Sequence, residues 1–270
     1  MRPRTVLFSL LAFAFLGSPA AHAQQGGSAT AVDLELVIAV DVSRSMDQEE
    51  FLLQRRGYIE AIRHPDFVAA ATAGRQGRIA LTYFEWSGRL YQKIVVPWRL
   101  IDGTEAAEHF AAALEGRPPD IGRGTSLSAA IAFGGGLFEA NGYDGARRVI
   151  DISGDGPNNY GPPVAEARDA AVAEGIVVNG LPVLIRPSPI VADIVRYYRD
   201  CVIGGPGSFV LPVRRLEEFA EAIRRKLILE VAALPEATII PVAAVEPTDC
   251  LIGERARGFY TDQYYPGLDK

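Results

Sequence analysis

The sequence predicts an α/β fold in which a mostly parallel central sheet has helices on both faces. The stretch 34–40 is apolar except for Glu35 and ends at Asp41, a pattern typical of a parallel strand that is buried on both sides. Further along the chain, segments of strand periodicity alternate with segments of helical periodicity, which favours a parallel sheet. Polar residues follow the first strand directly, at the position where open α/β sheets bind their ligands. We therefore expect a Rossmann-like architecture with a site at the carboxyl end of this strand.

The N-terminal segment has the pattern of a secretory signal peptide. Two arginines precede the apolar segment 6–16, and the small-x-small sequence Ala21-His22-Ala23 offers a cleavage site. The apolar segment is shorter than the roughly 20 residues that a membrane-spanning helix requires, and no later segment qualifies. We predict a signal peptide over 1–23, an N-terminal extension over 24–33 and no membrane span. The expected location is the periplasm or the outside of the cell.

The chain is acidic, with 27 Lys and Arg residues against 33 Asp and Glu residues and a formal net charge of −6. Removal of the signal peptide would take away two arginines and no acid, so the mature chain would be more acidic still. An acidic surface argues against a nucleic acid as partner. The sequence contains no Ser/Pro-rich linker and no internal repeat, so we predict one domain over 34–230 and a C-terminal extension over 231–270.

The elements after the first strand follow from periodicity and turn residues. Apolar residues at helical spacing predict a helix over 48–64, and a proline begins a second, short helix over 65–71. Alternating apolar residues predict a strand over 78–85. Ser87-Gly88 then turn the chain into a strand over 90–98, and a connection this short permits only antiparallel pairing. This last strand is expected at an edge of the sheet.

The second half of the chain continues the alternation. Residues 105–114 form a predicted helix, and a loop rich in Gly and Pro separates it from a helix that starts at Thr125 and extends to 140. A parallel strand over 147–153 ends at Gly154-Asp155-Gly156. The later predicted elements, in chain order, are the helix 164–174, the strand 176–183, the helix 190–200, the short strand 208–211 and the helix 216–230.

Periodicity fades after residue 234. Apolar pairs such as Ile239-Ile240 and Phe259-Tyr260 favour a segment that packs on the domain over the alternative of a disordered tail. Cys201 and Cys250 are the two cysteines of the chain, and an even count in an exported protein predicts one disulfide that ties this segment to the domain. Two free thiols are the alternative, because the sequence does not show whether the two residues approach within bonding distance.

Following the direction of each predicted element along the chain brings several oxygen-bearing side chains to one edge of the sheet. The carboxyl edge of the sheet holds the end of the first strand, the loop before the Thr125 helix and the end of the 147–153 strand. Carboxylate and hydroxyl oxygens are hard ligands that suit Mg²⁺, Mn²⁺ or Ca²⁺. The alternative is a strand end followed by a helix N-cap at Ser45 or Asp47. The candidate ligands are Asp41, Ser43, Ser45, Thr125 and Asp155.

These motifs resemble those of a known domain family. Asp41-x-Ser43-x-Ser45, a later Gly124-Thr125 and a strand that ends at Asp155-Gly156 are similar, in order and type, to the metal-ion-dependent adhesion site of the von Willebrand factor A (VWA) domain. The resemblance covers residues 34–230. More narrowly, the runs Glu85-Trp86-Ser87, 150–159 and 202–207 resemble an exported bacterial VWA-like family, domain of unknown function 1194. That narrower resemblance implies relatives but no activity.

The resemblance implies a mechanism of binding. Ser43, Ser45 and Thr125 would offer hydroxyl oxygens to a divalent cation, most simply Mg²⁺, with Mn²⁺ or Ca²⁺ as alternatives, and Asp41 and Asp155 would bind it directly or through water. Because these ligands are mostly neutral, the cation keeps affinity for one more anion. An acidic side chain of a partner protein would then complete its coordination.

Four further residues are expected around this site, and two other functions stay open. Glu85, Trp86, Asn158 and Asn159 are predicted to form a rim that shapes partner choice, although Trp86 is equally well explained by packing in the hairpin. Asp151 lies inside a strand and is expected to accept hydrogen bonds there. The alternatives to a binding module are a metal-independent envelope scaffold and a metal-dependent hydrolase. An enzyme is not our prediction, because a serine stands two residues after Asp41 where phosphate-transferring aspartate sites have a second acid.

Overall fold

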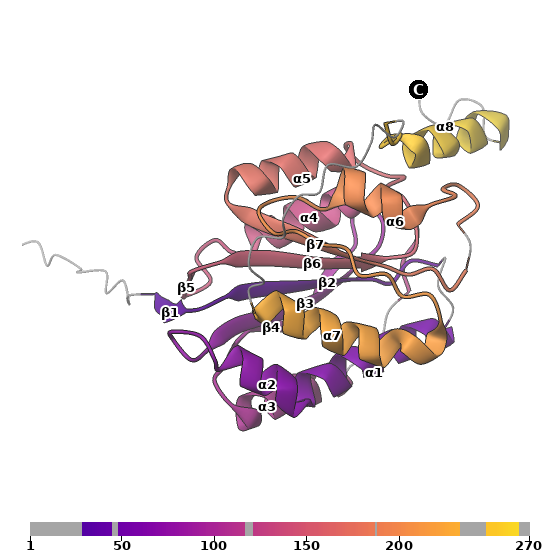
Figure 1. Cartoon of the computed structure of the whole chain (residues 1–270). Coiled ribbons are helices and arrows are strands. Elements are labelled where there is room, and N and C mark those ends of the chain that lie inside the picture. Colours follow the sequence, from indigo (N-terminus) through magenta and orange to yellow (C-terminus); the bar gives the residue numbers. More distant parts are fainter. Residues whose placement is uncertain (1–28, 45–47, 117–120, 187, 233–246, 265–270) are drawn as a thin grey trace, which may run out of the picture.

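The computed structural model describes residues 29–44, 48–116, 121–186, 188–232 and 247–264. Its centre is a five-stranded sheet in the order β4-β3-β2-β6-β7 (Figure 1). β2 pairs in parallel with both β3 and β6, β6 pairs in parallel with β7, and β4 is the antiparallel edge strand. The predicted sheet, including its antiparallel edge, is therefore confirmed. The five strands are β2 (Glu35–Asp41), β3 (Ile79–Trp86), β4 (Gln92–Ile101), β6 (Arg148–Gly154) and β7 (Ile176–Pro182).

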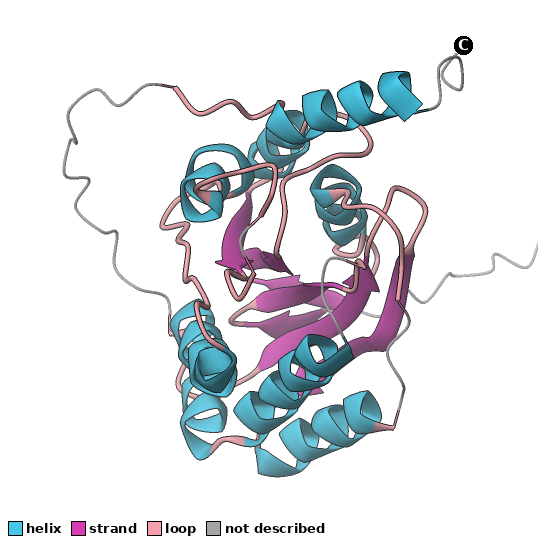
Figure 2. Cartoon of the chain, turned by 90° about the vertical axis from the view of Figure 1, so that its right-hand side faces the viewer, coloured by secondary structure: helices cyan, strands magenta, loops and turns pink. Residues whose placement is uncertain are grey.

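Helices cover both faces of the sheet, as Figures 1 and 2 show. One layer contains α1, α2, α3 and α7, which contact one another, and the other contains α4, α5 and α6. The first layer consists of α1 (Gln48–Arg63), α2 (Pro65–Ala71), α3 (Thr104–Glu115) and α7 (Phe219–Val231). The second consists of α4 (Leu127–Gly136), α5 (Val164–Ala173) and α6 (Ile194–Tyr197), which continues as a π-helical turn over Tyr198–Val202.

The central strand β2 explains why the fold has two cores. All seven of its residues are buried. Leu36, Ile38 and Val40 belong to the core on the α1/α7 side, whereas Val37 and Ala39 belong to the core on the α4/α5 side. This alternation follows from the two-residue repeat of a strand. Because each buried Leu, Ile or Val side chain contributes roughly 1.5–3 kcal/mol, the strand strongly fixes its own register.

Some elements differ from the sequence prediction. The helix expected from Thr125 to 140 begins at Leu127, because the Ser126 hydroxyl caps it by accepting a hydrogen bond from the Ala129 amide, and it ends at its three consecutive glycines. The strand expected over 208–211 is absent from the described residues, where Val210 forms only an isolated bridge to Gly180. Gly204-Gly205-Pro206-Gly207 precede it, and such residues disfavour a regular strand.

Two small elements complete the described chain. β1 (Thr30–Val32) pairs in parallel with β5 (Tyr143–Gly145) in a separate two-stranded sheet that the sequence analysis did not predict. The C-terminal extension forms α8 (Ile252–Tyr264). The predicted signal peptide and the apolar pair Ile239-Ile240 lie outside the described residues. Among the residues described, no helix is both long enough and apolar enough to cross a membrane.

Candidate functional site

The site is built around Asp41, the last residue of β2. Its side chain is fully buried, and its Oδ1 accepts a hydrogen bond from the Ser43 amide at 2.7 Å. The chain after the strand is held by the Val42 amide, which donates to the Trp86 carbonyl, and by the Gly122 amide, which donates to the Val42 carbonyl. Ser43 is also buried and bridges to Gly122. The first part of the predicted motif is thus fixed by backbone contacts at the carboxyl edge of the sheet.

Thr125 approaches the site from the loop before α4. Its side chain is only 5% exposed, although it lies at the rim of the sheet. The Thr125 amide donates to Asn159 Oδ1 at 2.9 Å, and the Thr125 carbonyl accepts from the amides of Asn159 and Tyr160. Thr125 is therefore joined to the loop that follows β6, which is the loop that carries Asp155.

Asp155 lies one residue beyond β6, between two glycines that allow close contacts. A Cβ atom on Gly154 would lie 3.0 Å from Asp41 Oδ2, and a Cβ atom on Gly156 would lie 4.0 Å from Thr125 Oγ1. A side chain at Gly154 would therefore crowd the Asp41 carboxylate. Asp41, Ser43, Thr125 and Asp155 lie at the same edge of the sheet, whereas Ser45 lies outside the described residues.

The Asp41 carboxylate is electrostatically unfavourable in the absence of a cation. Burial raises its pKa well above the usual range, and the neighbouring charge of Asp155 raises it further, while hydrogen bonds from Ser43 oppose the shift. Its Oδ2 atom is buried and makes no hydrogen bond with any described residue. A buried carboxylate oxygen without a hydrogen bond is costly, and a divalent cation would satisfy it. The residues present therefore fit such an ion.

The donor set is unusual in consisting of two carboxylates and several hydroxyls. The described part of the chain contains no group of three or more His, Cys, Asp or Glu side chains that could hold a metal. The candidate ligands are carboxylate and hydroxyl oxygens, and oxygen donors favour Mg²⁺, Mn²⁺ or Ca²⁺ over softer ions.

Tyr198 is a residue at the site that the sequence analysis missed. It comes from the π-helical turn after α6, is fully buried, and its hydroxyl makes no hydrogen bond with the described residues. A Cβ atom on Gly154 would lie 2.7 Å from this hydroxyl. Burial raises the pKa of Tyr198, and the charges of Asp41 and Asp155 raise it further. No periodic or motif signal in the sequence points to this residue, because its approach depends on the π-helical turn.

The predicted rim needs correction at three of its four residues. Glu85 and Trp86 are buried, and Glu85 forms an ion pair with Arg55. Trp86 packs in the core beneath the site, which agrees with the alternative that it has a packing role. Asn158 is fully buried as well, and its Oδ1 accepts from the Ser128 amide at 3.1 Å. These side chains support the edge of the sheet from within and are not available to a partner.

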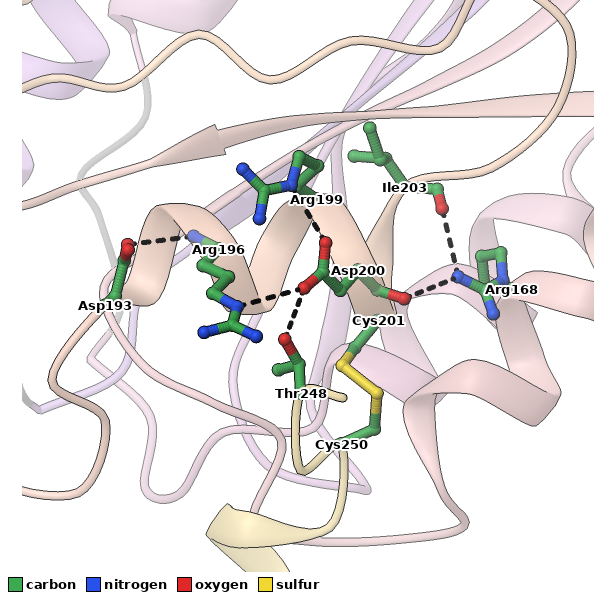
Figure 3. A network of polar contacts seen from close by, with 9 residues as sticks. All are labelled: Arg168, Asp193, Arg196, Arg199, Asp200, Cys201, Ile203, Thr248 and Cys250. Carbon is green, nitrogen blue, oxygen red and sulfur yellow. Dashed lines mark hydrogen bonds and ion pairs between the residues drawn. A yellow bond between two sulfur atoms is a disulfide. The ribbon is translucent and has the colours of Figure 1, made fainter. Parts of the chain in front are cut away.

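The C-terminal extension is attached to the same end of the fold. The predicted disulfide between Cys201 and Cys250 is present and joins the π-helical turn to the segment that leads into α8 (Figure 3). Next to it, Asp200 accepts hydrogen bonds from Arg199 Nε at 2.9 Å and from the Thr248 hydroxyl. Figure 3 shows these contacts beside the disulfide. The turn that carries Tyr198 is therefore cross-linked to the extension.

Comparison with known proteins agrees with this fold. The family described as "Protein of unknown function (DUF1194)" matches residues 31–235. No curated protein matches the chain. Among solved structures, proximal thread matrix protein 1 from the mussel byssus, described with a zinc-occupied MIDAS motif, superimposes with a TM-score of 0.52 at 15% identity, over 76% of this chain and 49% of its own.

Two bacterial structures are similar in the same way. The pilus adhesin SpaC from Lactobacillus rhamnosus GG gives a TM-score of 0.55 at 12% identity, over 74% of this chain and 30% of its own. The von Willebrand factor type A structure from Catenulispora acidiphila gives 0.51 at 16% identity, over 74% of this chain and 43% of its own. The chain thus spans half or less of each of these three proteins. At such low identity the likeness concerns the fold, which is that of a VWA domain.

Proposed function

Because this chain belongs to the DUF1194 family and has a VWA-like fold, we propose from its own site that it is an exported module that binds a partner protein through a divalent cation. Asp41, Ser43, Thr125 and Asp155, together with Ser45, would hold the cation, and Mg²⁺ is the ion we propose. The bound ion would supply an open coordination position for a carboxylate of the partner. The observation that carries the proposal is the buried, unpartnered Oδ2 of Asp41 beside Asp155.

The comparisons support this proposal at the level of the fold. One similar structure is described with zinc at its MIDAS motif, and another is a pilus adhesin. The disulfide supports export, since such bonds persist in oxidising compartments, and it agrees with the proposed signal peptide at 1–23. We propose the periplasm or the outside of the cell as its location.

The described histidines give no support to the hydrolase alternative. His64 caps the start of α2 by accepting a hydrogen bond from the Asp66 amide, and His109 lies within α3. Neither α2 nor α3 contributes a residue to the site, so neither histidine is positioned to activate a water molecule there. We therefore retain the binding module as the proposed function.

Isothermal titration with Mg²⁺ and with Mn²⁺ tests the proposal. Wild-type protein should bind one cation, and Thr125→Val should weaken binding at least about tenfold, because it removes a ligand oxygen while keeping the shape of the side chain. The matched control is Thr104→Val, an exposed threonine at the start of α3 on the opposite edge of the sheet. It should bind Mg²⁺ like the wild type.

Partner capture is the second readout. Immobilised protein should retain partners from an envelope extract in Mg²⁺ and release them in chelator, and Thr125→Val should need about tenfold more Mg²⁺ for the same capture. If Mg²⁺ does not bind, or if capture is unchanged in chelator, the metal-bridging function is wrong and the metal-independent scaffold is favoured.

A further inference from the structure

A groove lies near Thr125, beside the edge of the sheet that carries the candidate metal ligands. Its volume is about 610 Å³, within the usual range for binding pockets of roughly 300–1,000 Å³. The turn between β3 and β4, the loop before α4, the loop after β6 and helix α8 each contribute to its walls. Its lining includes Arg89, Leu90, Tyr91, Arg123, Tyr160 and Arg257.

The walls of this groove are continuous with the site. The Ser126 amide donates to the Ser87 carbonyl at 2.8 Å, which joins the β3–β4 turn to the residue after Thr125. The Tyr160 amide donates to the Thr125 carbonyl at 3.2 Å. The walls of the groove are therefore hydrogen-bonded to the residues around Thr125.

The walls of the groove pack closely against each other, which fixes the shape of the groove before a ligand binds. Gly124 has a φ of +78°, and a Cβ atom there would lie 2.6 Å from the Tyr160 ring. A Cβ atom on Gly88 would lie 2.4 Å from the Arg123 carbonyl oxygen. Glycine is thus required at both positions for the two walls to meet. A preformed groove loses less entropy when it binds a ligand.

Three arginines give this groove a charge opposite to that of the whole chain. Arg89 and Arg123 are exposed, and neither forms an ion pair with a described residue. The Arg257 guanidinium stacks on the Tyr160 ring, 3.6 Å from its centroid, which orients it at the groove. Since the chain carries a formal net charge of −6, this local clustering of positive charge would attract anionic ligands.

The remaining lining is aromatic and aliphatic. Tyr91 and Tyr160 present rings to the groove, and Leu90 is 89% exposed. Such a mixture fits a peptide, which carries both acidic and apolar side chains, better than a uniformly charged polysaccharide. Arginine and tyrosine are also the residues most enriched where proteins bind tightly to one another.

We infer that the groove receives an acidic peptide segment of the partner, whose carboxylates pair with Arg89 and Arg123 while another carboxylate reaches the candidate metal ligands at the edge of the sheet. This inference rests on the proposed function. It assigns partner selection to the arginines of the groove, in contrast to the buried residues first expected at the rim.

Fluorescence anisotropy tests the inference with a labelled peptide in which aspartate alternates with serine and leucine. In Mg²⁺, Arg123→Glu and Arg89→Glu should each weaken peptide binding about tenfold, because reversal replaces attraction with repulsion at a bound carboxylate. Rising salt should weaken binding as well. The matched control is Arg99→Glu, an exposed arginine towards the far end of β4, which should leave peptide affinity within twofold of wild type. A peptide with asparagine in place of aspartate should not bind.

The outcomes separate this inference from the proposed function. Peptide binding that needs Mg²⁺ but changes less than twofold in both groove variants overturns the groove and leaves the metal site standing. Binding that depends on the arginines but persists in chelator supports the groove and contradicts the metal-bridging function. The peptide assignment is wrong if no peptide binds, or if a sulfated polysaccharide binds more tightly with the same arginine dependence.

Discussion

Three charged side chains are buried together on the face of the sheet covered by α7. Lys226 Nζ lies 2.6 Å from Asp151 Oδ1 and 2.5 Å from Glu230 Oε1. The amide of Asn179 donates to the other oxygen of Glu230 at 2.5 Å. Asp151 is therefore a buried ion-pair partner of Lys226, where its place inside a strand led us to expect hydrogen bonds. One lysine faces two carboxyl groups here, so the cluster is sensitive to protonation.

The first prediction concerns the pH dependence of stability. Burial raises the pKa of Glu230 from 4.5 to about 7, although the charge of Lys226 opposes the shift. Between pH 4.5 and 7 the folded protein therefore holds a proton that the unfolded chain releases. The contribution of Glu230 to stability is complete below pH 4.5 and is lost as the pH rises towards 7, by at most about 1.4 kcal/mol per pH unit.

Glu230→Gln removes this proton uptake while keeping an oxygen for Lys226. We expect the free energy of unfolding of the variant, relative to wild type, to increase steadily from pH 5 to pH 7, as measured by urea denaturation. Carboxylates that do not contact this cluster, such as Asp200, are the same in both proteins and cancel in the difference. Burial also raises the pKa of Asp151, which shares Lys226 with Glu230, so the difference reports the titration of the two carboxyl groups together. A difference that stays constant with pH would show that Glu230 does not titrate in this range.

Among the helices, α8 contacts the loop after β6 and supports it; we call this contact the α8 brace. A Cβ atom on Gly253 would lie 2.1 Å from the Asn158 carbonyl oxygen, so the helix start and the loop are in direct contact. Asn158 Nδ2 donates to Glu254 Oε1 at 2.7 Å, while Asn159 in the same loop bonds to Thr125. The C-terminal extension therefore contacts the loop that positions the candidate metal ligands.

The second prediction tests this brace. Gly253→Ala should displace the start of α8, because the new methyl group would overlap a backbone atom that cannot easily move. We expect faster amide hydrogen exchange over residues 250–258, with little change in the strands of the sheet. Gly258→Ala is the matched control in the same helix, since a Cβ atom there meets nothing within 4 Å. Equal exchange in the two variants would contradict the role of α8 as a brace.

At the scale of the whole molecule, the direction of each element was predictable and the close contacts were not. The apolar run before Asp41 and the short turn at Ser87-Gly88 determine which strands are parallel and which is the antiparallel edge, and from these directions the meeting of Asp41, Thr125 and Asp155 at one edge follows. Hydrophobic periodicity contains this information because it specifies which face of each element is buried.

The surroundings of the site depend on contacts that periodicity does not encode. For Trp86 the sequence left a rim position and packing equally open, and the side chain lies in the core with Leu127 and Val164. Tyr198 reaches the site through a π-helical turn, a rare geometry that no spacing of residues in the sequence predicts. The three arginines of the groove come from segments far apart in the sequence, so only the folded chain brings them together.

The proposed cation site predicts how the stability of the whole domain changes with and without Mg²⁺. Without a cation, the buried charge of Asp41 beside Asp155 destabilises the fold, as the raised pKa of Asp41 reflects. Asp41→Asn removes this charge with little change of shape, so the metal-free variant should unfold at the same temperature as wild type or a higher one. Wild type should gain about 2.7 kcal/mol of stability when Mg²⁺ is present at a hundred times its dissociation constant, and the variant should lose this gain.

Thermal unfolding with chelator and with Mg²⁺ measures both effects on the same samples. Asp33→Asn is the matched control: Asp33 accepts hydrogen bonds from the Gln76 amide at the opposite edge of the sheet, so this variant should keep the full response to Mg²⁺ whatever its own stability. Two results would contradict the reasoning. A metal-free Asp41→Asn protein that is clearly less stable than wild type would mean that the carboxylate serves the fold, and an undiminished Mg²⁺ response in this variant would place the cation elsewhere. The opposite signs expected for the two conditions follow from one cause, because the charge that is costly in the empty site is the charge that the cation needs.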